Sequence, residues 1–152
     1  MNQFPSKNYF TMPNEIFSLG LDASEIAVYA YLRCLENRST YQCWPSYATI
    51  SKAVGRAKNT VMQYVDALSE KGLISTEPTS VLTKSRIKKN GNLRYTIRPI
   101  HEAVEIFHTR QLSAVELATE RRQIQRKLSA VNLLPGAEGK EQQNEAFHLH
   151  KL

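Results

Sequence analysis

Cysteine is scarce in this sequence, and no long apolar run is present. Cys34 and Cys43 lie nine positions apart, without a CxxC pair or histidines at zinc-finger spacing. His101 and His108 fall two helical turns apart, but no third ligand accompanies them. We therefore expect no metal, no functional disulfide and no cofactor. Because the sequence also lacks a run of about eighteen apolar residues and a secretory leader, we expect a cytoplasmic protein that makes no membrane contact.

Sequence motifs of catalysis are missing as well. The chain has no GxGxxG, no Walker lysine loop, no HExxH and no GxSxG. We therefore expect no catalytic residue and a protein that is not an enzyme.

Positive charge is abundant and concentrated. The net charge is +6 and the pI about 9.4. Residues 52–94 carry nine Lys or Arg against three acids, a net +6, so the remainder of the chain sums to about zero. A basic segment of this kind attracts polyanions, which favours a nucleic-acid partner.

Three helices are expected before residue 72, after a polar arm at residues 1–12 and a helical turn at 13–17. The first, residues 22–37, opens with a capping box of Asp22 and Glu25 and is apolar around most of its circumference, which predicts a central helix covered on several sides. A polar loop at residues 38–45 follows, with Trp44 as a core anchor. Ser46 then caps a short helix that Gly55 ends.

The third helix, residues 58–71, follows after a short turn containing glycine. This arrangement is typical of a helix-turn-helix. At about 100° per residue, Val61, Val65 and Leu68 share one face. The opposite face carries Asn59, Gln63, Asp66 and Glu70.

A β-hairpin is expected over residues 81–98. Leu93, Tyr95 and Ile97 alternate with polar residues, and Asn90-Gly91 is a strong signal for a hairpin turn between two β-prone runs. A hairpin directly after a helix-turn-helix is a wing.

Residues 99–134 are expected to form a long helix, followed by a disordered tail at 135–152. A 3-4 spacing of apolar positions is traced along this helix, interrupted by Arg110 and Arg121. We favour a homodimer seam, although the helix could instead fold back onto residues 22–37. The seam residues would be Phe107, Leu117, Ile124, Leu128 and Val131.

The stretch from Pro45 to Ile74 resembles the bacterial winged helix-turn-helix family. The resemblance rests on Gly55–Val61 and Leu68–Ile74 in order with a hairpin, and Phe10 to Ile100 is similar to the N-terminal domain of plasmid and mobile-element replication initiators. It implies a mainly α winged helix over residues 13–98, with a three-helix core and a β-hairpin wing. One departure is Ala57, where such proteins carry Ser or Thr as the N-cap of the third helix.

The resemblance implies binding of double-stranded DNA, with the third helix in the major groove. From position we expect base contacts from Arg56, Asn59, Thr60 and Gln63. Phosphate contacts are expected from Lys52, Lys58, Lys84, Arg86, Lys88, Lys89 and Arg94.

Three functions stay open at this point. The first is a sequence-specific transcriptional regulator that binds as a homodimer. The second is a replication-initiation or plasmid-maintenance factor of a mobile element. The third is a protein-interaction module that retains the fold without binding DNA.

Overall fold

The computed structural model describes residues 8–133. The start of the expected N-terminal arm and the whole expected tail at 135–152 lie outside these residues. The chain divides into two compact units, Met1–Thr109 and Arg110–Leu152, which we describe separately. Within residues 8–133, no helix combines the length and apolar character needed to span a membrane.

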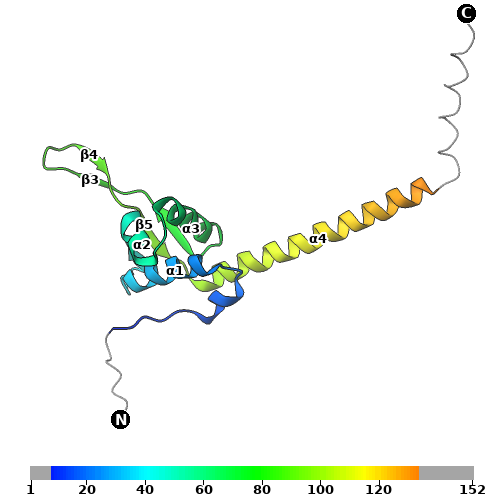
Figure 1. Cartoon of the computed structure of the whole chain (residues 1–152), viewed down its shortest axis with the longest axis horizontal. Helices are drawn as coiled ribbons and strands as arrows, with labels where there is room; N and C mark the ends of the chain where they lie inside the picture. The colour runs from blue at the N-terminus through cyan, green and yellow to red at the C-terminus, as the bar shows by residue number, and fades with distance from the viewer. Residues whose placement is uncertain (1–7, 134–152) are drawn as a thin grey trace, which may run out of the picture. The chain divides into compact units, whose positions relative to one another are not determined.

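The elements follow the order of a winged helix, as Figure 1 shows. Their bounds are η1 (Asn14–Ser18), α1 (Ala23–Leu35), β1 (Gln42–Cys43), α2 (Tyr47–Val54), α3 (Lys58–Glu70), β2 (Ile74–Glu77), β3 (Ser80–Leu82), β4 (Lys88–Asn90), β5 (Arg94–Ile97) and α4 (Ile100–Asn132). The expected fold is thereby confirmed: three helices, a β-hairpin wing and a long C-terminal helix.

Helix α1 begins as predicted and leaves one side exposed. Asp22 accepts a hydrogen bond from the Glu25 amide, and the Glu25 carboxylate accepts one from the Asp22 amide, which completes the capping box. Only one side of α1 is fully buried, by Glu25, Val28, Tyr29 and Leu32, whereas Leu35 is 42% exposed. Ile26 and Tyr31 on the flanks also pack against the core, and α1 contacts α2, α3 and β5, so the helix is covered on several sides but not all round.

A strand interrupts the loop that was predicted for residues 38–45. Strand β1 pairs with β5 and completes a three-stranded antiparallel sheet in the order β1-β5-β2. Successive strand side chains point to opposite faces, so Cys43 points inward and is buried while Trp44, directly after it, is 48% exposed. The prediction that Trp44 anchors the core was therefore wrong.

The wing forms, but its turn is not at Asn90-Gly91. Strands β3 and β4 pair from Ser80 opposite Asn90 to Leu82 opposite Lys88, so the turn spans residues 83–87, with Arg86 at a left-handed φ of 56°. We call residues 80–90 the wing hairpin. Gly91 follows β4, where a Cβ would lie 2.6 Å from Thr79 Oγ1. The glycine there allows a close approach of two chain segments rather than a turn.

The core of unit 1 lies between the three helices and the sheet. Large side chains from each of these elements are fully buried. The first turns of α4 close this core, with Ala103 buried and Ile100, Val104 and Phe107 packed against it. The rest of α4 belongs to unit 2, where residues 110–133 are exposed throughout.

Candidate nucleic-acid interface

The connection between α2 and α3 is fixed by hydrogen bonds and one glycine. Ser46 caps α2 by accepting a hydrogen bond from the Thr49 amide. Gly55 ends α2 in the left-handed conformation, with φ 67°, and its amide donates to the Ser51 carbonyl. No atom lies within 4 Å of a Cβ built on Gly55, so this position needs glycine for its backbone angle and not for space.

Helix α3 has the predicted buried and exposed faces. Val61, Val65 and Leu68 are at most 1% exposed. Asn59 and Gln63 are exposed on the outer face, as are Asp66 and Glu70 further along it. Thr60, at the flank, is half-buried. The residues that we expect to contact bases are therefore accessible and rest on a helix whose inner side is closely packed.

Helix α3 begins without a side-chain cap. Ala57 occupies the N-cap position in an extended conformation and offers no oxygen to the amides of the first turn. Unpaired amides at a helix N-terminus favour an anion, because the helix dipole adds to their hydrogen-bonding capacity. Lys58, exposed at the same end, adds a full positive charge.

Arg56 lies beside the first turn of α1. Its Nε donates to Ser24 Oγ over 3.1 Å, and the side chain remains exposed. No sequence pattern predicts this contact, since Ser24 lies 32 positions earlier. Arg56 is thus held at the entrance of α3, where a DNA contact would require it to exchange Ser24 for a base or phosphate.

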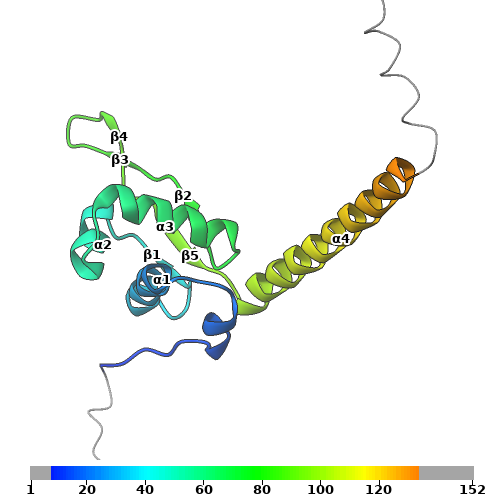
Figure 2. The ribbon, with the colours of Figure 1, turned by 45° about the vertical axis from the view of Figure 1, so that its right-hand side comes forward.

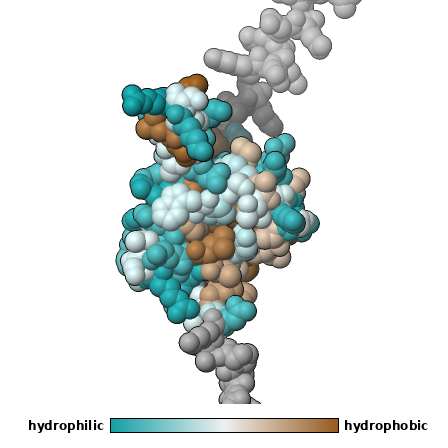
Figure 3. All heavy atoms as spheres, turned by 90° about the vertical axis from the view of Figure 1, so that its left-hand side faces the viewer, coloured by the Kyte–Doolittle hydropathy of each residue, from teal (hydrophilic) through white to brown (hydrophobic). Residues whose placement is uncertain are grey.

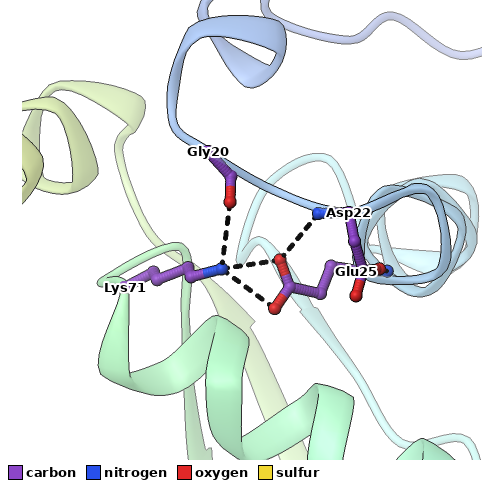
Figure 4. Close-up of polar contacts among 4 residues, drawn as sticks. All are labelled: Gly20, Asp22, Glu25 and Lys71. Carbon is purple, nitrogen blue, oxygen red and sulfur yellow. Dashed lines mark hydrogen bonds and ion pairs between the residues drawn. The ribbon is translucent and has the colours of Figure 1, made fainter.

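A partly buried ion pair links the other end of α3 to α1 (Figure 4). Lys71 Nζ lies 2.7 Å from Glu25 Oε2 and 2.9 Å from Oε1, and it also donates to the Gly20 carbonyl over 3.4 Å. Glu25 is 7% exposed and already belongs to the α1 capping box. The lysine of the Leu-x-x-Lys-Gly-Leu-Ile segment therefore has a structural role, which the sequence analysis did not assign.

The wing hairpin carries four exposed cations, namely Lys84, Arg86, Lys88 and Lys89. Arg94, the last of the five phosphate contacts predicted for the wing, lies outside the hairpin on β5 and forms an ion pair with Glu77 on β2. Its charge is therefore locally neutralised. Lys52 on α2 is exposed, as predicted for a phosphate contact.

Apolar side chains accompany these cations, which the sequence analysis missed. Val81, Leu82 and Ile87 are 56%, 72% and 58% exposed. The register places Val81 opposite Lys89 and Leu82 opposite Lys88. Figure 3, viewed from the side of the hairpin, shows hydrophilic and hydrophobic atoms side by side on it. The sequence does carry one signal for this exposed apolar surface. Three apolar residues lie among lysines, and the strand that pairs with β3 contains no apolar residue.

The wing hairpin and α3 lie on the same side of unit 1. In the two ribbon views, α3 lies on the side of the unit nearer the hairpin and α1 on the side away from it (Figures 1 and 2). The outer face of α3 and the basic hairpin together form an exposed surface with two protruding parts.

Burial raises the pKa of three groups in unit 1, the phenols of Tyr47 and Tyr95 and the thiol of Cys43. Burial raises the pKa of Tyr47, and the Asp66 carboxylate adds to the shift. Burial raises the pKa of Tyr95, with smaller contributions from Tyr47 and Cys43. Burial, followed by the Glu36 carboxylate, raises the pKa of Cys43 to about 11. The Cys43 thiol is thus protonated at neutral pH and unsuited to redox chemistry or metal binding.

The predicted seam residues fall into two environments. Phe107 packs against the core of unit 1 and makes an edge contact with the ring of His108. The other four, Leu117, Ile124, Leu128 and Val131, belong to unit 2 and are more than half exposed. Among residues 8–133, no cluster of His, Cys, Asp or Glu could hold a metal ion.

Comparison with known proteins identifies the domain in unit 1. The sequence profile of the family described as "Helix-turn-helix domain" matches residues 19–74, from the end of η1 to the start of β2. No curated protein matches the chain.

Several solved structures are similar in fold at low sequence identity. A possible transcriptional regulator from Methanosarcina mazei is 17% identical with a TM-score of 0.47, covering 76% of this chain and 97% of its own. A MarR-like transcriptional regulator from Thermotoga maritima is 16% identical with a TM-score of 0.39, covering 82% and 84%. The multiple antibiotic-resistance repressor of Listeria monocytogenes is 16% identical with a TM-score of 0.38, covering 76% and 75%. The profile match agrees with the arrangement of α2 and α3 around Gly55, so residues 19–74 contain a helix-turn-helix.

Proposed function

We propose that this chain is a sequence-specific double-stranded DNA-binding protein that regulates transcription. The observation that carries the proposal is the pairing of an exposed polar face on α3 with a basic wing hairpin on the same side of unit 1. Helix α3 enters the major groove, and the hairpin contacts the flanking phosphates.

Base recognition is assigned to the first half of α3. Asn59 and Gln63 offer paired donor and acceptor groups that match adenine N6 and N7. Arg56 reaches guanine or a phosphate, and Thr60 contacts the flank of the site. Asp66 and Glu70 repel phosphates, so the second half of α3 tilts away from the DNA backbone.

Phosphate binding is assigned to the cations around this helix. They neutralise backbone charge and release counterions, which gives affinity without sequence preference. The residues are Lys52, Lys58, Lys84, Arg86, Lys88 and Lys89. Arg94 contributes only where DNA displaces Glu77 from its ion pair.

The proposal includes self-association through the exposed part of α4. Two linked domains would bind two half-sites with greater avidity than one. The four exposed apolar side chains from Leu117 to Val131 supply the seam, while Phe107 is largely engaged in the core of unit 1.

A replication or plasmid-maintenance role would use the same surface, because residue chemistry does not separate the two processes. It is the finer interpretation that the resemblance to replication initiators implies. Mapping the bound sites distinguishes the roles: promoter-proximal sites support regulation, and repeated sites within an origin support replication.

The test is selection of bound fragments from random duplex DNA with the full chain, followed by comparison with a Gln63→Ala variant. We expect an enriched motif with two related half-sites. Gln63→Ala should relax preference at one base pair of each half-site, by about fivefold to tenfold. Met62→Ala, adjacent on α3, is the matched control and should leave the motif unchanged. Enrichment of no motif at all would contradict sequence-specific binding.

A further inference from the structure

The exposed part of α4 presents a regular apolar seam that no other residue among 110–133 covers. Leu117, Ile124, Leu128 and Val131 are 54–60% exposed. With Ala114 and Arg121 they occupy successive a and d positions of a heptad pattern. A seam of this kind fits a second α-helix with the same spacing, in either parallel or antiparallel orientation.

Beyond Arg110, charge along this part of α4 is divided into two blocks. Glu116 and Glu120 come first, and four cations follow within the next seven residues, namely Arg121, Arg122, Arg126 and Lys127. Between residues 110 and 132 no acid has a base three or four positions away. The helix therefore lacks the internal ion pairs that support a solitary helix, and each block is available to an opposite charge from outside.

A parallel pairing of two copies would leave the two charge blocks without opposite charges across the seam. Each seam residue would face its own counterpart, so the two Arg121 side chains would meet inside the seam. Glu120 would lie beside Gln125 of the second copy, and Lys127 beside Asn132, so no ion pair would form across the seam. A parallel dimer thus places two like charges together and leaves the opposite charges unpaired.

An antiparallel pairing resolves both problems in one register. The register opposes Arg121 to Ile124, Leu117 to Leu128, and Ala114 to Val131. Small and large side chains then share a layer, and no arginine faces an arginine. In the same register Glu120, flanking the seam, lies opposite Lys127 of the second copy, and the symmetry of the pair makes this contact twice.

We propose that α4 pairs with α4 of a second copy of this chain in antiparallel orientation, centred between Arg122 and Gln123. Two Glu120–Lys127 ion pairs between the copies select the direction. This inference rests on the self-association that the proposed function includes, and it adds the orientation, the register and the residues that determine them.

Cysteine cross-linking tests the orientation directly. In a Cys34→Ser background, where Cys43 stays buried, the full chain is made as Ala114→Cys and as Val131→Cys. The two positions lie 17 residues apart in the sequence, about 25 Å along a helix, whereas a disulfide needs Cβ atoms about 4 Å apart. We expect a cross-link only after the two variants are mixed and allowed to exchange. A cross-link within each variant alone overturns the antiparallel orientation.

Charge reversal tests the residues that select the direction. Glu120→Lys and Lys127→Glu should each weaken dimerisation by about tenfold at low salt, because each replaces two attractive pairs by two repulsive ones. The combined variant should restore the dissociation constant to within about threefold. Glu116→Lys makes the same change in charge off the seam and should have little effect. Equal effects of Glu116→Lys and Glu120→Lys would overturn the assigned pair.

Sedimentation of the unmodified chain separates this inference from the proposed function. A dimer at micromolar concentration supports the pairing. A monomer that still binds a single half-site overturns the pairing while leaving DNA binding by α3 intact. A dimer that binds no DNA supports the pairing and contradicts the proposed function.

Discussion

Helix α3 and the wing hairpin present two very different kinds of surface to the same partner. On α3 the inner side chains are buried and both ends are held, by the Gly55 turn at one end and the Lys71–Glu25 ion pair at the other. Every residue of strands β3 and β4 is exposed. Under the proposed function this difference would correspond to a division of roles, in which the closely packed helix distinguishes bases and the exposed hairpin supplies charge. Four predictions follow this contrast from the largest expected effect to the smallest.

Truncating a buried side chain of α3 should lower the free energy of unfolding far more than truncating an exposed side chain of the hairpin. Leu68→Ala removes a fully buried side chain and should lower the free energy of unfolding by about 3 kcal/mol. Leu82→Ala, at a position 72% exposed, should change it by less than about 0.5 kcal/mol. Urea denaturation followed by circular dichroism measures both. Equal losses would remove the contrast.

Reversing the charge of the hairpin should weaken binding to every duplex alike. Lys88→Glu combined with Lys89→Glu should lower affinity about 100-fold at low salt and reduce the slope of log K against log salt by about two. Fluorescence anisotropy with specific and random duplexes measures both quantities. The double change to arginine keeps the charge and should bind normally. Unchanged affinity of the double glutamate variant for random duplex would refute the role of the hairpin.

Removing the Lys71 cation at the C-terminal end of α3 should weaken the attachment of α3 to α1 and lower the stability of the protein. Lys71→Met leaves the Glu25 carboxylate buried without its partner. Because Lys71 is partly exposed, we expect a loss of about 2 kcal/mol rather than the larger cost of a fully buried pair. Thermal denaturation measures the loss, and Lys71→Arg should recover most of it. A Lys71→Met variant as stable as the unmodified chain would show that the ion pair contributes nothing.

Capping α3 should stabilise the free protein and weaken its binding to DNA. Ala57→Ser adds a hydroxyl that can accept from the first-turn amides, worth about 1 kcal/mol in unfolding free energy. If a DNA phosphate uses those amides in the complex, the serine competes with it and affinity should fall a few-fold. Ala57→Gly adds no acceptor and is the control. A rise in stability with no change in affinity would place the phosphate elsewhere.

The helices could be predicted from sequence because their signals are local. The capping box of Asp22 and Glu25, the Ser46 cap and the terminating Gly55 each act within a few residues, and all three are where the sequence placed them. The buried face of α3 followed from its period alone.

The misplaced features depend on contacts between distant segments. Strand β1 exists only because β5, more than fifty residues later, pairs with it, and this pairing also turns Trp44 outward. The hairpin turn lies at residues 83–87 and not at Asn90-Gly91, because β3 pairs with β4 from Ser80 opposite Asn90 to Leu82 opposite Lys88. Gly91 follows this pairing and lies close to Thr79.

The candidate site was predictable in its outline but not in its internal pairings. Exposure of Asn59, Gln63 and the hairpin lysines followed from periodicity and composition. The contacts of Arg56 with Ser24 and of Arg94 with Glu77 did not, because side-chain partners far apart in sequence leave no periodic signal.

Gly72, which follows α3 at φ 76°, has a consequence for sequence variation in this protein. A Cβ at this position would collide with the Ile106 side chain and lie 3.6 Å from the Cα of Ala103, both on the first turns of α4 within unit 1. The Ile106 contact is with Cδ1, the mobile end of that side chain, and 3.6 Å is an ordinary contact distance, so the left-handed backbone angle is the main restriction at Gly72. In a saturation mutagenesis library selected for folding, asparagine should be the best tolerated replacement at Gly72, as at Gly55, and at Gly72 it should also require the Ile106 side chain to move.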